Sequence, residues 1–229
     1  MPNWCNNVLI IKGPEEEIEK FTKEAKGEKT EFSISKFLPI PEDLNIESGS
    51  LSSLALTFFG NEEHRKNNKS LFHKTSDDDW RKLSYIIDSL TEKRLPITFE
   101  NAKQLVLETH PGLETFSKKV ISNIEKYGYT DWYDWCIANW GTKWDVEAEL
   151  SQREKSIVHY TFDSAWSPPL EAIKSISSKF PTLKFGIKYS EPGNCFAGEA
   201  VYKNGECVYE RETEYDAFYD VLDRDEEKE

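Results

Sequence analysis

Hydrophobic positions near the N-terminus follow a strand, helix, strand order. Residues 4–11 contain a continuous apolar run, which predicts a central strand covered on both faces. Residues 14–27 predict a helix, because Pro14 suits a first turn and the acidic residues after it favour the positive end of the helix dipole. The apolar stripe of this helix is formed by Ile18, Phe21 and Ala25. Residues 31–38 alternate apolar and polar positions, which predicts a second strand ending at Pro-Ile-Pro.

The C-terminal half repeats this order. Residues 156–163 place alternate apolar side chains on one face and predict a strand. A helix should follow, with Ser167 as its N-cap and Pro168 at its first position. Residues 183–189 alternate strictly, which is typical of a strand with one solvated face. The predicted buried residues are Val158, Tyr160, Phe162, Leu170, Ile173, Ile176, Phe180, Leu183, Phe185, Ile187 and Tyr189.

Two β-α-β units in one chain predict an α+β protein with a ferredoxin-like antiparallel sheet. Residues 196–210, centred on Asn204-Gly205, predict a hairpin that extends the sheet. Its predicted inner face carries Phe196, Ala200, Tyr202, Cys207 and Tyr209. A last helix is expected at 214–223, with Asp216, Asp220 and Asp223 on its outer face.

The middle of the chain has a different pattern. Amphipathic helices are predicted at 77–90 and 112–127, and polar stretches surround them. We therefore expect residues 42–141 to form an inserted, mainly helical subdomain. The ferredoxin-like core should then consist of residues 1–41 and 142–229.

Composition favours a folded, acidic, cytoplasmic protein. Aromatic residues make up 13% of the 229 residues, enough for a substantial core, and the formal net charge is −13. The N-terminus has neither a basic flank nor a long apolar run, so we expect no export signal and no membrane span. Residues 212–229 hold nine acidic and two basic residues. Such a field disfavours direct nucleic-acid binding and favours a partner protein with a basic surface, although a solvated helix face with a frayed end explains it equally simply.

The four cysteines are expected to be reduced thiols. They show no CxxC pair and no zinc-finger spacing. If Asn204-Gly205 is the hairpin turn, Tyr202 faces Cys207 and Lys203 faces Glu206, which puts Cys195 out of register for a disulfide with Cys207.

Four ordered motifs carry a family resemblance. They are MPNWCNN at the N-terminus, NWGTKWD at 139–145, AWSPP at 165–169, and EPG at 191–193 followed by FAG at 196–198. With them, residues 1–41 and 130–210 resemble the YubB-type ferredoxin-like domain of plasmid- and phage-encoded proteins. The resemblance implies the fold and a mobile-element origin, but no catalytic residues.

The two tryptophan motifs and the EPG motif supply the candidate contact residues for a ligand or partner. They are Trp140, Thr142, Lys143, Trp144, Asp145, Trp166, Ser167 and Glu191. One hypothesis is a pocket in which Lys143 and backbone N–H groups at the start of the Ser167 helix hold a phosphate or carboxylate. The alternative is packing of Trp144 on Trp166, with Lys143 and Asp145 as a local ion pair. Seven aromatic residues between Tyr127 and Trp144 likewise form either a stacking platform or part of the core.

No reaction motif is present. The sequence has no HExxH, nucleophile elbow, phosphate-binding loop or EF-hand, and its four histidines are scattered. We therefore predict no catalytic residue, no metal and no cofactor.

The leading functional hypothesis is a non-enzymatic accessory protein of a phage or plasmid that binds a host protein. An inhibitor of a nucleic-acid-handling defence enzyme, such as an anti-CRISPR protein, fits an acidic ligand for a basic target. The candidate acidic partner surface consists of Asp216, Asp220, Asp223, Asp225, Glu226 and Glu227. One alternative is a small-ligand or nucleotide-binding module, or a hydrolase, with its pocket at the GTKWD and AWSPP segments. Another is a purely structural accessory subunit. The sequence leaves the oligomeric state open.

Overall fold

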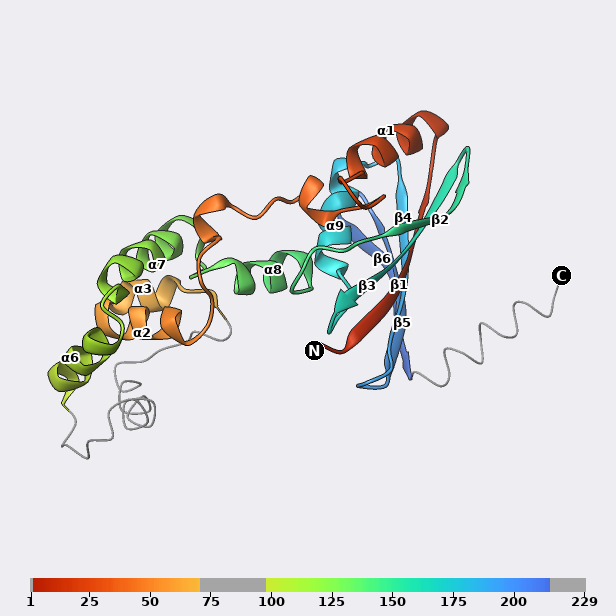
Figure 1. Cartoon of the computed structure of the whole chain (residues 1–229). Coiled ribbons are helices and arrows are strands. Elements are labelled where there is room, and N and C mark those ends of the chain that lie inside the picture. Colours follow the sequence, from red (N-terminus) through yellow and green to blue (C-terminus); the bar gives the residue numbers. More distant parts are fainter. Residues whose placement is uncertain (1, 71–97, 215–229) are drawn as a thin grey trace. The chain divides into compact units, whose positions relative to one another are not determined.

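The chain divides into two compact units. In the computed structural model, which describes residues 2–70 and 98–214, one unit comprises Met1–Pro39 with Cys136–Glu229 and the other comprises Ile40–Trp135 (Figure 1). The boundaries expected from the sequence were 41/42 and 141/142. We call the two parts the ferredoxin-like unit and the helical unit.

The ferredoxin-like unit is built on one six-stranded antiparallel sheet (Figure 1). The strands are β1 (Trp4–Lys12), β2 (Glu149–Glu154), β3 (Ile157–Ala165), β4 (Lys184–Glu191), β5 (Phe196–Lys203) and β6 (Glu206–Glu214). Their spatial order is β2-β3-β1-β4-β5-β6. The first four strands have the ferredoxin-like order, and the β5–β6 hairpin extends the sheet beyond β4. This confirms the predicted fold class.

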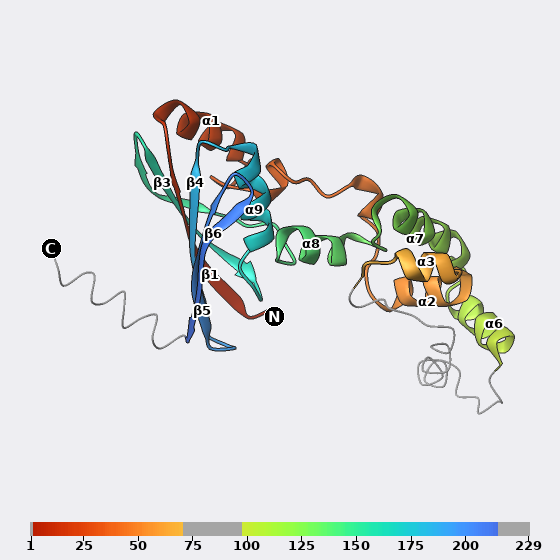
Figure 2. The ribbon, with the colours of Figure 1, turned by 180° about the vertical axis from the view of Figure 1, so that it is seen from behind.

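Helices α1 (Glu15–Ala25) and α9 (Leu170–Lys179) cover the same face of this sheet (Figure 2). The predicted stripe of α1 is buried, and Phe21 lies at its centre. The Phe21 ring is 5.2 Å from the Phe180 ring at the end of α9 and 5.5 Å from the Phe185 ring of β4. Aromatic packing therefore joins both helices to the sheet.

The second face of the sheet, which we call the open face, is solvated. Along β1, buried residues alternate with exposed or half-buried ones, so Val8 and Ile10 are only half-buried. The prediction that β1 is covered on both faces was therefore wrong. Its central position is confirmed, because it pairs with both β3 and β4.

Residues 31–38 are not a strand, which corrects the sequence prediction. The chain forms a single 3₁₀ turn, η1 (Ile34–Lys36), although Phe32 and Ile34 are fully buried. The Asp145 carboxylate accepts hydrogen bonds from the backbone N–H groups of Ile34 (2.7 Å) and Ser35 (3.2 Å). A distant side chain thus satisfies donors that a β ladder would have used. The second strand of the ferredoxin-like order is β2, after the insertion.

The predicted start of α9 also needs correction. The helix begins at Leu170 after Pro169, and neither Ser167 nor Pro168 belongs to it. The Ser167 hydroxyl donates to the Gly141 carbonyl (2.5 Å) and does not cap the helix. The first turn of α9 has no side-chain cap, and the Leu170 N–H donates instead to the Pro168 carbonyl (2.9 Å).

The C-terminal hairpin is confirmed in its turn and register. Tyr202 pairs with Cys207 and Lys203 pairs with Glu206 around Asn204-Gly205. All four cysteines are free. The predicted inner face is only partly correct, because Cys207 and Tyr209 on β6 are exposed, next to a bulge in the β5–β6 register. Residue 214 ends β6, and the rest of the helix predicted at 214–223 lies outside the described residues.

The helical unit has its own hydrophobic core. Its described elements are η2 (Glu42–Leu44), α2 (Ser50–Phe59), α3 (Glu62–Asn67), α6 (Phe99–Thr109) and α7 (Leu113–Tyr127), and the boundary with the other unit falls within α8 (Trp132–Trp140). The core residues are Leu54, Ala55, Leu56, Phe58, Ala102, Val106, Leu113, Val120 and Ile124. The helix predicted at 112–127 is confirmed, and that predicted at 77–90 lies outside the described residues. Across the described ranges, no helix has the length and apolar character needed to span a membrane.

Candidate partner-binding site

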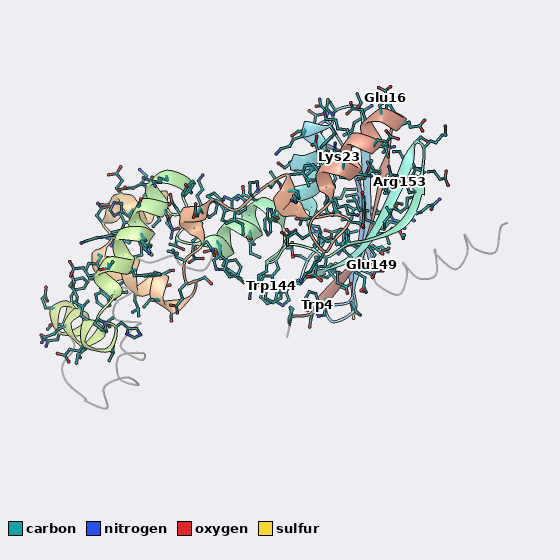
Figure 3. All side chains as sticks on the ribbon, turned by 45° about the horizontal axis from the view of Figure 1, so that its top comes forward. Trp4, Glu16, Lys23, Trp144, Glu149 and Arg153 are labelled. Atoms are coloured by element: carbon teal, nitrogen blue, oxygen red, sulfur yellow. The ribbon has the colours of Figure 1, made fainter. Side chains whose placement is uncertain are left out.

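Three tryptophans are exposed together in the ferredoxin-like unit. Trp4 begins β1, Trp144 precedes β2 and Trp166 follows β3, and 46%, 38% and 39% of their respective surfaces are exposed. The Trp4 and Trp144 rings lie 6.2 Å apart (Figure 3). The Lys143 Nζ atom lies 4.5 Å from the Trp144 ring and 5.1 Å from the Trp166 ring. We call these four residues the tryptophan cluster.

The two segments that carry the cluster are fastened to each other. Besides the Ser167 to Gly141 bond, the Thr142 hydroxyl donates to the Ala165 carbonyl (3.1 Å). Gly141 has a φ of 81°, and a Cβ added there would lie 3.1 Å from the Pro168 carbonyl oxygen. Glycine is therefore needed both for the backbone conformation and for this close approach. These contacts hold NWGTKWD against AWSPP.

The backbone at Trp166 is unusual. Its φ is 68°, a left-handed conformation that is rare for a bulky residue. The Trp166 N–H donates to the Asn3 carbonyl (2.9 Å), and this bond ties the segment before β1 to the end of β3. The Trp166 N–H is therefore used within the protein and Pro168 and Pro169 have none, so backbone donors for the predicted anion site would come from Ser167 and the first turn of α9.

Asp145 fastens the next part of the cluster segment. Its carboxylate also accepts from the Ser33 hydroxyl (2.7 Å) and from the Val146 N–H (2.8 Å). Asp145 and Lys143 therefore make different contacts. The Asp145 carboxylate accepts hydrogen bonds from backbone N–H groups, and the Lys143 ammonium lies over tryptophan rings. The expected packing of Trp144 and Trp166 is mediated by a cation–π contact with Lys143.

Asn7 lies on the buried side of the sheet, and the sequence analysis did not single it out. Its side-chain amide donates to the Cys5 carbonyl (2.7 Å) and to the Ser164 hydroxyl (2.9 Å). Ser164 in turn donates to the Ser167 carbonyl (2.7 Å). An amide residue within an apolar strand could have indicated this network, because a buried amide needs hydrogen-bond partners. This network connects β1 to the AWSPP segment.

Trp140 and Glu191 are used in packing. Trp140 is buried and its indole N–H donates to the Leu38 carbonyl (3.0 Å). The buried Glu191 carboxylate accepts from the N–H groups of Gly193 (2.6 Å) and Asn194 (2.7 Å) and so shapes the turn after β4. Neither side chain joins the tryptophan cluster.

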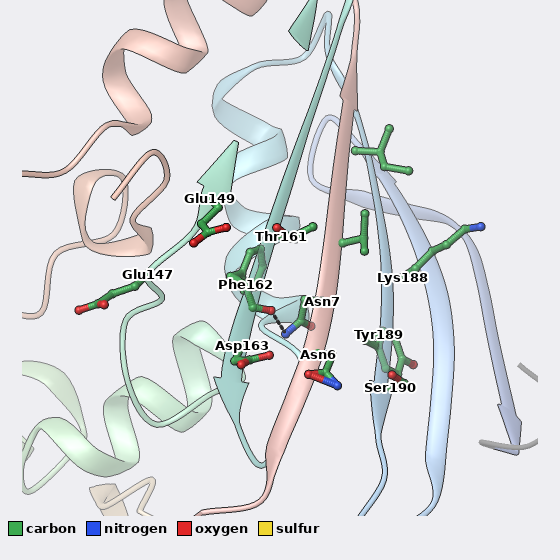
Figure 4. A pocket seen from close by; sticks show the side chains of 12 residues that line it. Asn6, Asn7, Glu147, Glu149, Thr161, Phe162, Asp163, Lys188, Tyr189 and Ser190 are labelled. Atoms are coloured by element: carbon green, nitrogen blue, oxygen red, sulfur yellow. Dashed lines mark hydrogen bonds between the residues drawn. The ribbon is translucent and has the colours of Figure 1, made fainter. Parts of the chain in front are cut away.

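A groove on the open face begins beside the cluster. It has a volume of about 620 Å³ and crosses β3, β1 and β4 (Figure 4). Its charged side chains are Glu147, Glu149 and Asp163 on one side and Lys188 on the other (Figure 4). We call it the acidic groove. Asn6 in the groove is two residues from Trp4 on the same face of β1.

A second cavity of about 750 Å³ lies at the start of α9. Gly141 and Ser167 line it, so part of the pocket predicted between GTKWD and AWSPP exists. Its titratable lining residues are Glu171, Tyr189, Cys195 and Glu212. Two carboxylates and no basic side chain make it a poor site for the phosphate or carboxylate expected there.

The cysteines differ sharply in accessibility, which gives a direct test. Burial, with a smaller contribution from Glu191, raises the pKa of the Cys5 thiol to about 12, so it stays protonated at pH 8. Cys136 is also buried, whereas Cys195 and Cys207 are exposed. Iodoacetamide at pH 8 should modify two thiols of the native protein and four in urea, as counted by mass spectrometry. Native modification of Cys5 would contradict the buried network.

Within 2–70 and 98–214, no group of three His, Cys, Asp or Glu side chains is placed to hold a metal ion. The acidic surface predicted from Asp216, Asp220, Asp223, Asp225, Glu226 and Glu227 lies outside the described residues.

The fold and the tryptophan cluster define a ferredoxin-like α+β protein with an exposed aromatic surface. Comparison with known proteins agrees on the fold: residues 139–229 match the family described as "Ferredoxin-like domain in Api92-like protein". The crystal structure of a protein api92 from Yersinia pseudotuberculosis aligns with 93% of this chain and 98% of that chain, at 17% sequence identity and a TM-score of 0.45. No curated protein matches the chain.

Proposed function

We propose that this protein is a non-enzymatic binding protein that takes a partner protein at the tryptophan cluster. The observation that carries the proposal is the exposure of Trp4, Trp144 and Trp166 within one fastened surface. Tryptophan is the residue most enriched at binding hot spots, because a large rigid ring is buried with little loss of conformational freedom. The hydrogen bonds between the NWGTKWD and AWSPP segments, and the one from Trp166 to Asn3, would hold the rings ready for a partner.

Charge supports a partner with a basic surface. The acidic groove next to the cluster carries three carboxylates and one ammonium, and the whole chain has a formal charge of −13. A basic surface would be attracted during encounter and would place cations against both the carboxylates and the tryptophan rings.

The proposal extends to the biological class. We propose a mobile-element accessory protein whose target is a nucleic-acid-handling defence enzyme of the host, as for an anti-CRISPR protein. The support is the resemblance of the four sequence motifs to YubB-type domains, together with the acidic charge. Enzymes that handle nucleic acids present basic surfaces to phosphate backbones, and an acidic protein competes for such surfaces.

Affinity capture with a matched variant tests this function. The wild-type protein and a Trp4→Ala/Trp144→Ala variant would be used to capture proteins from bacterial lysate at low and high salt. We expect wild type to capture a nucleic-acid-handling protein. Its affinity for the double variant should fall about 1,000-fold, because hot-spot residues contribute about 2 kcal/mol or more each. High salt should also weaken capture.

Tyr209→Ala is the control for loss of an exposed aromatic side chain. Tyr209 lies on β6 outside the cluster and has the same exposed fraction as Trp4, 46%. This variant should capture the partner as wild type does. Equal capture by the double tryptophan variant, or no nucleic-acid-handling protein captured at low salt, would reject the proposed function.

A further inference from the structure

A row of lysines crosses the open face at the end away from Trp4. Lys12 on β1 pairs directly with Lys184 on β4, and Lys184 pairs with Lys203 on β5. All three side chains are exposed and share the open face. Directly opposed residues on neighbouring strands are only about 5 Å apart, so like charges there destabilise the sheet. This arrangement is unexpected in so acidic a chain.

The lysines are not neutralised by ion pairs. Among the described residues, the salt bridges involve Lys26, Lys126, Lys155 and His64, and none involves Lys12, Lys184, Lys188 or Lys203. The carboxylates nearby in the sheet register are Glu154, Glu199 and Glu206. Glu199 accepts a hydrogen bond from the Tyr209 hydroxyl (3.0 Å), which directs it toward β6.

A depression of about 210 Å³ lies beside this row. Its floor exists because Gly186 has no side chain between Ile10 on β1 and Val201 on β5. The charged side chains around it are Lys12, Lys184, Lys188 and Glu199. Glycine in a strand interior weakens the strand and commonly marks a place where a ligand or backbone approaches closely.

The fold itself does not require glycine at this position. Gly186 does not have a left-handed φ, and the nearest atom to an added Cβ would be the Ile10 carbonyl oxygen at an ordinary 3.7 Å. By contrast, a Cβ at Gly198 on the neighbouring strand would lie 2.5 Å from the Tyr189 hydroxyl. Among residues 2–70 and 98–214, none fills the space over Gly186, which is open toward solvent.

We propose that this depression binds a phosphate-bearing small ligand of nucleotide size, with its phosphate on Lys12, Lys184 and Lys188 and its flat apolar part over Gly186. The three ammonium groups supply the charge-assisted donors that a phosphate requires. Ile10 and Val201 supply apolar contact on both sides of the open floor. The site shares Ile10 and Lys188 with the acidic groove but contains no residue of the tryptophan cluster, and it does not depend on the function proposed for the cluster.

Nuclear magnetic resonance titration of the full chain tests the site. AMP, pyrophosphate and adenosine would be added at low salt. The signals followed are the backbone signals of Ile10, Gly186 and Val201 and the imidazole signals of His159, which pairs with Ile10 in the β1–β3 register. AMP should shift these signals and bind more tightly than either pyrophosphate or adenosine, since only AMP offers both phosphate and a flat ring. Each of Lys12→Ala and Lys184→Ala should weaken AMP binding about tenfold.

Gly186→Val separates binding from folding. A valine suits an antiparallel strand and its Cβ meets no close atom, so this variant should be folded and at least as stable as wild type, yet should lose AMP binding. Lys174→Ala, on the outer surface of α9, should bind as wild type does. The proposal is overturned if AMP leaves these signals unmoved, if pyrophosphate binds as tightly as AMP, or if folded Gly186→Val still binds AMP. Binding only of longer single strands of DNA would also overturn it in favour of a nucleic-acid surface.

Discussion

Phe21→Ala is expected to lower the free energy of unfolding of the ferredoxin-like unit by about 4 kcal/mol, the range found for large aromatic residues removed from a core. Phe21 is fully buried and joins both helices to the sheet. The rings within contact distance are Phe32, Phe37, Tyr160, Phe180 and Phe185. Because these rings come from four different segments, none can collapse into the cavity without disturbing another.

Urea denaturation followed by far-ultraviolet circular dichroism measures this effect. Lys23→Ala is the matched control, because Lys23 lies on the exposed side of the same helix (Figure 3). It should change stability by less than about 0.5 kcal/mol, as is usual for surface sites. If Phe21→Ala had an equally small effect, the aromatic core described here would be incorrect.

Asp145→Ala should destabilise the ferredoxin-like unit by about 3 kcal/mol, because it leaves several donors without their charged acceptor. The carboxylate accepts from the Ser33 hydroxyl and from the N–H groups of Ile34, Ser35 and Val146. Asp145→Asn keeps one acceptor oxygen and the shape of the side chain. It should therefore recover part of the lost stability.

The same variants distinguish support from direct contact at the cluster. Asp145 holds the backbone next to Trp144 but is not one of the exposed rings. Asp145→Ala should broaden or shift the indole signal of Trp144 in nuclear magnetic resonance spectra, whereas a purely local effect near residues 33–35 would leave that signal unchanged. Thermal unfolding of both variants against wild type measures the stability change itself.

The sequence correctly predicted the elements whose hydrogen bonds are made within a helix, within a turn or between regularly paired strands. Helix α1, strands β3 and β4 and the Asn204-Gly205 turn were all predicted, since helical spacing, strict alternation and turn chemistry are local properties. Phe32 and Ile34 alternate as in a strand, but their segment is fixed by Asp145, far along the chain. No local pattern contains that bond.

The sequence predicted which segments form the candidate site, but not which of their side chains are exposed or lie close together. The motifs NWGTKWD and AWSPP do meet, yet the sequence could not show that Trp140 is buried while Trp144 is exposed, because both lie in equally aromatic surroundings. Trp4 was missed as a member of the cluster, although it starts the first strand. Its ring reaches Trp144 only through the pairing of β1 with β3, which places Trp4 opposite Ala165.

The position of the insertion has a consequence for how the chain folds during synthesis. β1 is made first, but Leu9 pairs with Tyr160 and Ile187, which leave the ribosome only after the whole helical unit. The helical unit has its own core and can fold while β1 still has no neighbouring strand. Contacts between such distant residues make folding slow. Until the last third of the chain is synthesised, β1 has no partner strand, and its apolar residues are exposed to pairing with a strand of another protein.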